Sequence, residues 1–209
     1  MSYFDKLITD YPVLSECRND IEKAFDFMCQ TYESGGSVYV CGNGGSAADC
    51  QHIVGELMKG FEKKRTVAFP PEVSAKLSPE TRKLLESKLQ GALPCHSLTS
   101  ENALIMALSN DISADIVFAQ QIYGYGRKGD SLICISTSGN AYNVCLAAEL
   151  AKAIGLHTIA MTDRSGGILC GICDTVIRVP ADITAEVQEL HLPVYHALCR
   201  AVEGHFFVE

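Results

Sequence analysis

His52 and Glu56 lie four residues apart, just after a turn that is unusually rich in glycine. The turn spans residues 42–46, has the sequence Gly-Asn-Gly-Gly-Ser, and follows the apolar run Val-Tyr-Val-Cys. Residues four apart on a helix project from one face, so the imidazole and the carboxylate can hydrogen-bond, share a metal ion or exchange a proton. An ordinary solvent-exposed pair has the same spacing, so spacing alone leaves that alternative open.

A second loop, at residues 136–140, has the sequence Ser-Thr-Ser-Gly-Asn and also follows an apolar run. Where a strand ends and a helix begins, free backbone N–H groups, hydroxyls and glycines together bind anions well. Neither loop contains Lys or Arg, and neither fits the complete motif for a nucleoside triphosphate or a dinucleotide. The loops therefore favour a single phosphate monoester and predict no nucleotide cofactor. The alternative is a pair of tight turns with capped helices.

Strand and helix patterns alternate along most of the chain. Apolar runs that predict buried strands lie at 37–42, 130–136, 157–163 and 174–180, and helical spacing occurs over 46–59, 140–154 and 185–207. This alternation predicts a three-layer α/β fold, in which helices cover both faces of a parallel sheet. Helical spacing from Leu14 to Tyr32 predicts one long amphipathic helix. Ser46 and Asp49 predict a capping-box-like pair at the start of the helix that follows the glycine-rich turn.

The 209 residues suit a single α/β domain over 1–209, with residues 1–34 forming an N-terminal helical segment. From 61 to 96 the regular pattern loosens. Within this stretch, Ser78 followed by Pro79 and Glu80 is typical of a helix start. We therefore expect an inserted helical excursion over 61–96 that acts as a lid or a subunit contact.

The net charge of −8 argues against a nucleic-acid-binding protein, because phosphate contacts need clustered Lys and Arg. The short basic run from Lys63 to Arg65 predicts a solvated loop. The sequence contains no apolar stretch of 18 residues and no leader-like segment after Met1, so we expect a cytoplasmic protein without a membrane span. The ten cysteines are expected to be reduced. Cys170 and Cys173 form a lone CxxC pair, too little for a zinc ribbon, and leave only a redox role open.

Three stretches carry a family resemblance: CGNGGSAADCQH at 41–52, ISTSGNAYNV at 135–144 and VQELHLPVYH at 187–196. Together they resemble the sugar isomerase (SIS) domain family, and within it the phosphoheptose isomerases. The resemblance implies a five-stranded parallel sheet flanked by helices and assembly as a homotetramer. It also implies conversion of sedoheptulose 7-phosphate to D-glycero-D-manno-heptose 7-phosphate through an enediol. Such an isomerisation moves protons between neighbouring atoms and needs no redox cofactor.

The resemblance implies roles for individual residues. Glu56 corresponds to the catalytic base and His196 to its acid/base partner. The residues implied in substrate and phosphate binding are Asn43, Gly44, Gly45, Ser46, Asp111, Ser136, Thr137, Ser138 and Gln188. The residues implied as zinc ligands are His52, Glu56, Gln188 and His196.

Gln188 and His196 are eight residues apart, which corresponds to about 12 Å along one helix. They are therefore hard to bring onto one metal ion from a single chain. Either neighbouring subunits share a site, or Pro193 kinks the helix and shortens the gap. Glutamine is also an uncommon zinc ligand.

The chain departs from the family pattern at four positions. Ala141 stands where the family has a serine, Gly60 where it has an arginine and Ala185 where it has an aspartate, and Pro193 falls inside the last helix. These departures bear on the sugar more than on the reaction type. One alternative function is a non-enzymatic scaffold, like a relative that binds the replication initiator but lacks the H-x-x-x-E arrangement. Another is a sensor of sugar phosphates or an isomerase for a different ketose phosphate.

Overall fold

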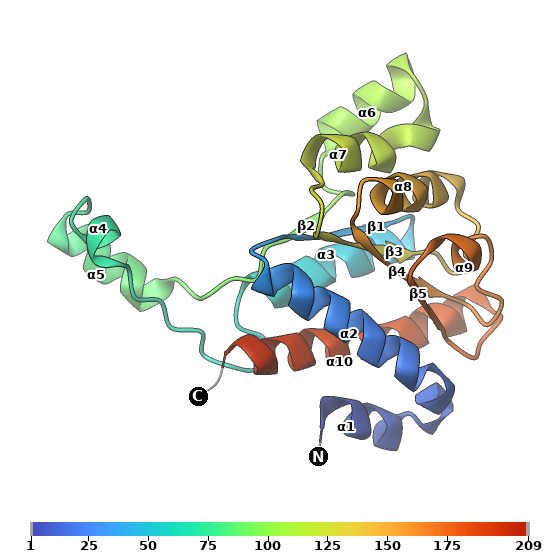
Figure 1. Ribbon diagram of the computed structural model, residues 1–209, viewed down its shortest axis with the longest axis horizontal. Helices are drawn as coiled ribbons and strands as arrows, with labels where there is room; N and C mark the ends of the chain where they lie inside the picture. The colour runs from blue at the N-terminus through green and yellow to red at the C-terminus, as the bar shows by residue number, and fades with distance from the viewer. Residues whose placement is uncertain (1, 208–209) are drawn as a thin grey trace.

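Five parallel strands form one sheet in the computed structural model, which describes residues 2–207 (Figure 1). The strands are β1 (Val38–Gly42), β2 (Cys95–Ser97), β3 (Ser131–Ile135), β4 (His157–Thr162) and β5 (Thr175–Arg178). Their order is β2-β1-β3-β4-β5, so the chain winds to one side of β1 for β2 and to the other side for β3. Open sheets of this kind bind ligands where the winding reverses, outside the carboxyl ends of the strands.

Helices cover both faces of the sheet, as predicted. The helices are α1 (Tyr3–Asp10), η1 (Pro12–Cys17), α2 (Arg18–Glu33), α3 (Gly45–Met58), α4 (Pro71–Ser74), α5 (Pro79–Lys88), α6 (Asn102–Asp111), η2 (Ala114–Ile116), α7 (Val117–Tyr125), α8 (Tyr142–Ala153), α9 (Leu169–Ile172) and α10 (Thr184–Phe206). Helices α2, α3 and α10 pack on one face, and α7, α8 and α9 pack on the other. The expected three-layer α/β fold is confirmed.

The register of the two central strands brings the two predicted phosphate loops together. β1 and β3 are buried along their whole length, as expected for apolar strands in the middle of a parallel sheet. They pair from Val38 opposite Ser131 to Gly42 opposite Ile135. Because the strands run in the same direction, the loops that follow Gly42 and Ile135 leave the sheet side by side.

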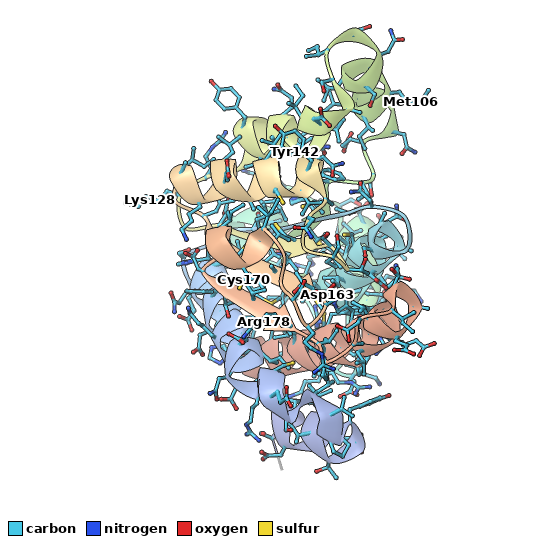
Figure 2. The ribbon with its side chains drawn as sticks, turned by 90° about the vertical axis from the view of Figure 1, so that its right-hand side faces the viewer. Met106, Lys128, Tyr142, Asp163, Cys170 and Arg178 are labelled. Atoms are coloured by element: carbon cyan, nitrogen blue, oxygen red, sulfur yellow. The ribbon has the colours of Figure 1, made fainter. Side chains whose placement is uncertain are left out.

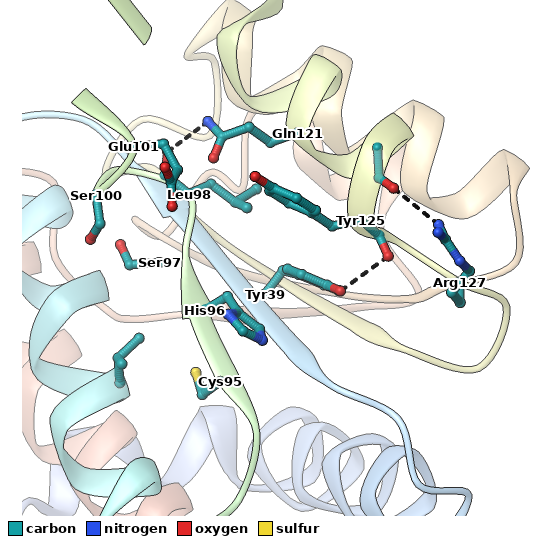
Figure 3. A pocket seen from close by; sticks show the side chains of 12 residues that line it. Tyr39, Cys95, His96, Ser97, Leu98, Ser100, Glu101, Gln121, Tyr125 and Arg127 are labelled. Atoms are coloured by element: carbon teal, nitrogen blue, oxygen red, sulfur yellow. Dashed lines mark hydrogen bonds between the residues drawn. The ribbon is translucent and has the colours of Figure 1, made fainter. Parts of the chain in front are cut away.

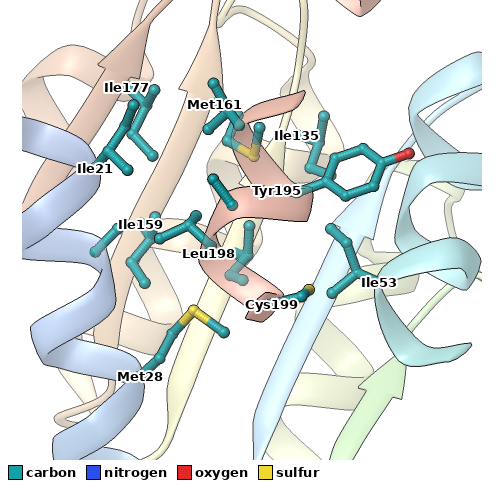
Figure 4. Close-up of a cluster of buried hydrophobic side chains, with 14 of the residues drawn as sticks. Ile21, Met28, Ile53, Ile135, Ile159, Met161, Ile177, Tyr195, Leu198 and Cys199 are labelled. Carbon is teal, nitrogen blue, oxygen red and sulfur yellow. The ribbon is translucent and has the colours of Figure 1, made fainter. Parts of the chain in front are cut away.

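The core beneath α3 and α10 fixes the helices that carry the candidate acid/base residues. Ile53 of α3, Leu198 of α10 and Met28 of α2 pack against strand side chains such as Ile135 and Ile159 (Figure 4). Burial of each such side chain contributes roughly 1.5–3 kcal/mol. The two helices are therefore held in fixed positions on the sheet.

Two expectations about helix starts are wrong. Leu14 belongs to η1, so the single helix expected from Leu14 to Tyr32 consists of η1 followed by α2. The expected capping pair is also absent, because α3 starts at Gly45 and its N-cap Gly44 makes no side-chain bond. Ser46 is buried in the first turn, and Asp49 accepts a hydrogen bond from another helix.

Pro193 does not interrupt the last helix, and α10 continues through it from Thr184 to Phe206. Proline removes one backbone donor, whose acceptor would be the carbonyl of Glu189. Glu189 is exposed, so solvent can satisfy that carbonyl. Gln188 and His196 consequently remain about 12 Å apart along α10.

Residues 66–90, called the arm below, extend from the body of the molecule (Figure 1). The arm contains α4 and α5, and Ser78 caps α5 by accepting a hydrogen bond from the backbone of Thr81, as its sequence predicts. An antiparallel bridge between Thr66 and Gln90 closes the base of the arm. The sequence did not predict β2, which begins at the end of the 61–96 excursion, because three residues are too few to show a period.

Arg65 is buried rather than solvated, which corrects the expectation for the basic run. Its Nε donates to Glu203 at 2.9 Å, and its Nη1 and Nη2 donate to the carbonyls of Leu57 at 2.6 Å and Glu56 at 3.1 Å. Those two carbonyls end α3, so the buried guanidinium caps the helix that carries Glu56. Sequence patterns could not reveal this, because the partner Glu203 lies 138 residues away.

Among residues 2–207, no helix combines the length and the hydropathy that crossing a membrane requires. All ten cysteines are free thiols, and all but two of them are buried, as expected for small apolar side chains. The two others are Cys170, which is exposed on α9 (Figure 2), and the half-buried Cys173.

Candidate active site

The two predicted phosphate loops line one cavity of about 330 Å³ at the carboxyl ends of β1 and β3. The residues that line it are Asn43, Gly44, Gly45, Ser46, Ile135, Ser136, Thr137, Ser138, Ala141, Thr184 and Gln188. The cavity therefore gathers all the loop residues implied in phosphate binding, together with Gln188. It contains no Lys or Arg, so an anion there would be held by amides, hydroxyls and the amino-terminal ends of α3 and α8.

Two glycines give the first loop its shape. Gly44 has a φ of +57°, a conformation that other residues adopt at a cost. Gly45 lies so close to Gln188 that a Cβ at this position would be 2.5 Å from the amide nitrogen of Gln188. The glycine-rich sequence thus lets α10 place the Gln188 side chain against the loop.

The helix that follows the second loop is tied to the first loop through two asparagines. The amides of Asn43 and Asn143 donate to each other, at 2.9 Å and 3.1 Å. Ser136 is buried, and its hydroxyl accepts a hydrogen bond from the backbone of Ala141, the N-cap of α8. Ala141 gives α8 no side-chain cap, so the helix end that faces the cavity keeps free N–H groups.

A separate cluster of acid/base groups forms where α3 packs on α10. The side chains of His52 and Glu56 meet as their spacing predicts, with His52 Nε2 3.1 Å from Glu56 Oε1. His52 Nδ1 lies 2.9 Å from the hydroxyl of Tyr195, and this hydroxyl donates to Asp49 at 3.2 Å. Burial raises the pKa of the Asp49 carboxyl, although the Tyr195 hydrogen bond and His52 oppose the shift. Four residues on two helices thus form one hydrogen-bonded chain.

His196 borders this cluster. The centres of the His52 and His196 rings are 5.0 Å apart, and the His196 ring lies 5.4 Å from that of Phe61. Burial lowers the pKa of His196, and the nearby charges of His52 and Arg200 lower it further. Its Nε2 is buried without a hydrogen-bond partner. His196 is therefore a neutral imidazole with one free nitrogen at neutral pH.

Within one chain, the cavity and the acid/base cluster are distinct places. Ser46 and Glu56 are ten residues apart on α3, a rise of about 15 Å. On α10, Gln188 lies beside the start of α3, and His196 lies about 12 Å further along the helix, beside His52. Neither Glu56 nor His196 lines the cavity that the loops form.

A family comparison decides what kind of protein carries these loops. The SIS domain matches residues 3–88 and 87–163. The chain belongs to the SIS domain family. It is similar to a phosphoheptose isomerase from Akkermansia muciniphila, with 33% identity over 95% of this chain and 92% of that protein.

Solved structures of SIS relatives agree with the fold. The phosphoheptose isomerase GmhA from Neisseria gonorrhoeae has 30% identity and a TM-score of 0.68, and the match covers 95% of this chain and 98% of that one. A phosphoheptose isomerase from Francisella tularensis has 28% identity and a TM-score of 0.71, over 97% and 99% of the two chains. The expected membership of the SIS family is therefore confirmed.

The four zinc ligands expected for this SIS domain do not converge within one chain. His52, Glu56 and His196 belong to the acid/base cluster, whereas Gln188 lies against Gly45 in the cavity. Among residues 2–207, no group of three or more His, Cys, Asp or Glu side chains is arranged to hold a metal ion. The donor set of a single chain thus does not fit the ion.

Asp111 is the one predicted substrate-binding residue that lies apart from the cavity. It is the last residue of α6, where it is exposed and accepts a hydrogen bond from the amide of Asn110. It does not line the cavity that the loops form. Its implied contact with the sugar stays a prediction.

A larger cavity, of about 580 Å³, lies between β2 and α7 and includes none of the predicted site residues (Figure 3). His96 stacks on Tyr39 along its wall, with ring centres 5.5 Å apart. Size alone therefore does not indicate the site of chemistry in this domain.

Sequence reasoning missed residues whose partners are distant in the chain. Tyr195 and Asp49 complete the hydrogen-bonded chain through His52, and Asn143 joins the two loops. Tyr195 directly precedes His196, but adjacency on a helix gives no sign that its hydroxyl reaches α3. His191, three residues after Gln188 on α10, is fully buried, and burial lowers its pKa to about 4.

Proposed function

We propose that this protein is a ketose–aldose isomerase that converts sedoheptulose 7-phosphate to D-glycero-D-manno-heptose 7-phosphate. The observation that carries the proposal is the single cavity formed by the two hydroxyl-rich loops, which suits a phosphate monoester. Membership of the SIS family and relatives named phosphoheptose isomerase support an enzyme that isomerises a phosphosugar. The reaction moves one proton from carbon 1 to carbon 2 and one from the O1 hydroxyl to the O2 carbonyl oxygen.

Glu56 is the group that we expect to move the proton between the two carbons. Its Oε1 lies 3.1 Å from His52 Nε2, and His52 Nδ1 lies 2.9 Å from the Tyr195 hydroxyl, so a hydrogen-bonded chain orients the Glu56 carboxylate. A carboxylate held in this way can accept a proton from one carbon and return it to the next.

His196 suits the oxygens of the substrate. As a neutral imidazole it can take a proton from a hydroxyl and give one to a carbonyl oxygen without first losing a charge. The lowered pKa of His196 keeps it neutral, and its unpartnered Nε2 is free to receive a hydrogen bond.

The distance between the two halves leads us to propose that two copies of the chain form one site. An extended chain of eight bonds, from phosphorus to carbon 1 of a heptose 7-phosphate, spans about 10 Å. The rise from Ser46 to Glu56 is about 15 Å, and neither Glu56 nor His196 lines the cavity that the loops form. A phosphate in the loops of one copy therefore presents its sugar to Glu56 and His196 of another copy, within the homo-oligomer that the family resemblance implies. The same pairing would bring Gln188 of one copy towards His52, Glu56 and His196 of the other, which the family resemblance implies as the remaining zinc ligands.

Turnover of sedoheptulose 7-phosphate by wild type and Glu56→Gln tests the proposal. Loss of the base should lower kcat by about 10²–10⁴-fold, while calorimetry should show that the sugar phosphate still binds. Glu62→Gln makes the same change on an exposed side chain nearby and should keep wild-type kcat. Wild-type protein that binds the sugar phosphate without converting it would instead be a sensor.

Mixing two inactive variants tests the shared site. Co-expressed Glu56→Gln and Ser136→Ala/Ser138→Ala chains should regain about a quarter of wild-type activity, because random pairing gives one intact site in four. Mass spectrometry shows whether mixed oligomers form. If they form but have no activity, Glu56 of each chain acts on the sugar phosphate bound in the loops of the same chain.

A scaffold function is the remaining alternative. A scaffold does not need His52 or Glu56. Both residues are present in this protein and are held by contacts with each other and with Tyr195, which favours the enzyme over the scaffold. Binding of a replication initiator by Glu56→Gln, together with an inactive wild type, would favour the scaffold.

A further inference from the structure

The arm, residues 66–90, packs on no other element among the residues that the structure describes, 2–207. Neither α4 nor α5 contributes a buried residue. α5 is 10 residues long, and isolated helices shorter than about 12–15 residues are only marginally stable in water. The arm nevertheless exposes several apolar side chains, with Leu84 59% exposed, Leu89 45% exposed and Val73 38% exposed. Such a helix gains stability when another surface covers its apolar side.

Charge indicates which kind of surface fits. The arm contains four Lys and Arg against three Glu, a net charge of +1, whereas the whole chain carries −8. Residues 101–125, which form α6, η2 and α7, contain Glu101, Asp111 and Asp115 and no Lys or Arg. The positive arm is thus complementary in charge to the acidic end of the same fold.

The acidic end also exposes apolar side chains that match those of the arm. Met106 is 72% exposed, Ile112 69% and Tyr123 72%, and Figure 2 shows Met106 on α6 at the outer end of the molecule. In Figure 1 the arm and α6 extend from the body in different directions, so one chain does not bring them together. A second copy of the chain would present its α6–α7 surface to the arm of the first.

We propose that the arm of one copy docks on the α6–α7 surface of a second copy, with Leu84 against its apolar side chains and Lys83 beside its acidic ones. A two-fold arrangement lets each copy offer its arm to the other, which doubles the contact. This inference does not rest on the proposed isomerase activity, because assembly is measured without substrate.

Sedimentation velocity of the full chain over a range of concentrations tests the proposal. Wild type should sediment as a multiple of the 22.6 kDa chain. Leu84→Asp should weaken its association about tenfold or more. Val13→Asp, a matched change at a side chain that is 52% exposed elsewhere, should sediment like wild type. Replacing residues 67–89 by two glycines should act like Leu84→Asp, because Thr66 and Gln90 already lie paired at the base.

A charge exchange tests the docking surface. Lys83→Glu should weaken association, and adding Asp115→Lys should restore it. A monomeric wild type, or arm variants that assemble like wild type, would overturn the proposal; in the second case the arm binds a different macromolecule. Weakening by Lys83→Glu that Asp115→Lys does not reverse would show that α6–α7 is the wrong surface.

Discussion

The amides of Asn43 and Asn143 bond to each other reciprocally, at 2.9 Å and 3.1 Å, although the two residues are 100 positions apart. The pair joins the loop after β1 to the first turn of α8, which follows the loop after β3. It therefore fixes the distance between the two groups of amides and hydroxyls that would hold one phosphate.

Asn143→Ala should loosen this link and raise KM for the sugar phosphate about 2–10-fold, with kcat nearly unchanged, because a typical hydrogen bond contributes about 0.5–1.5 kcal/mol. Steady-state kinetics measure both constants. Asn19→Ala removes an exposed amide on α2 and serves as the control. A change confined to kcat would show that the pair acts on the chemical step instead.

Ala141→Ser should strengthen anion binding at the start of α8. The serine hydroxyl would cap the helix, and its proton could point into the cavity that Ala141 lines. We expect inorganic phosphate to bind about tenfold more tightly by calorimetry. Ala75→Ser in the arm is the control, and unchanged affinity in Ala141→Ser would place the phosphate elsewhere.

The pH dependence of kcat should report the lowered pKa of His196. Burial and the charges of His52 and Arg200 favour its neutral form, so kcat should stay level as the pH falls towards about 6.5 and decline only below it. kcat is the appropriate constant, because the substrate's own phosphate titrates near pH 6 and affects binding. His196→Asn should lose this acidic decline along with most of the activity. A decline that begins above pH 7 would contradict the assignment.

The buried pair of Arg65 and Glu203 should make the fold sensitive to acid. Burial alone would raise the pKa of Glu203, but hydrogen bonds from the backbone of Glu62 and Phe61 and from Arg65 outweigh it and hold the pKa below its ordinary value. A carboxyl with a lowered pKa stabilises the fold above the unfolded value of about 4.3, and this stability is lost as the pH falls below it. Urea unfolding at pH 7 and at successively lower pH measures the loss.

Glu203→Gln should lower the free energy of unfolding by about 3–5 kcal/mol at pH 7, because Arg65 would remain buried without its charged partner. Glu62→Gln, at an ion pair whose carboxylate side chain is 43% exposed, should cost about 1 kcal/mol or less. Equal losses in the two variants at one protein concentration would mean that burial of the pair is energetically unimportant.

Local sequence determined the parts of the fold that depend on short-range patterns. The apolar runs predicted four of the five strands, and Ser78 with Pro79 predicted the start of α5. The glycine- and serine-rich loops were recognisable because a helix start that binds an anion needs small residues and hydroxyls in sequence. The spacing of His52 and Glu56 predicted their contact because four residues nearly complete one helical turn.

Only the tertiary structure decided which of these pieces meet. The register of β1 and β3 placed the two loops around one cavity, and the packing of α3 on α10 added Tyr195 and Asp49 to the acid/base cluster. It also buried Arg65 against Glu203, where composition predicted a solvated loop. Contacts between residues more than 100 positions apart leave no periodic trace in a single sequence, because each partner satisfies only its own local pattern. Their partners become fixed when the sheet and its helices pack.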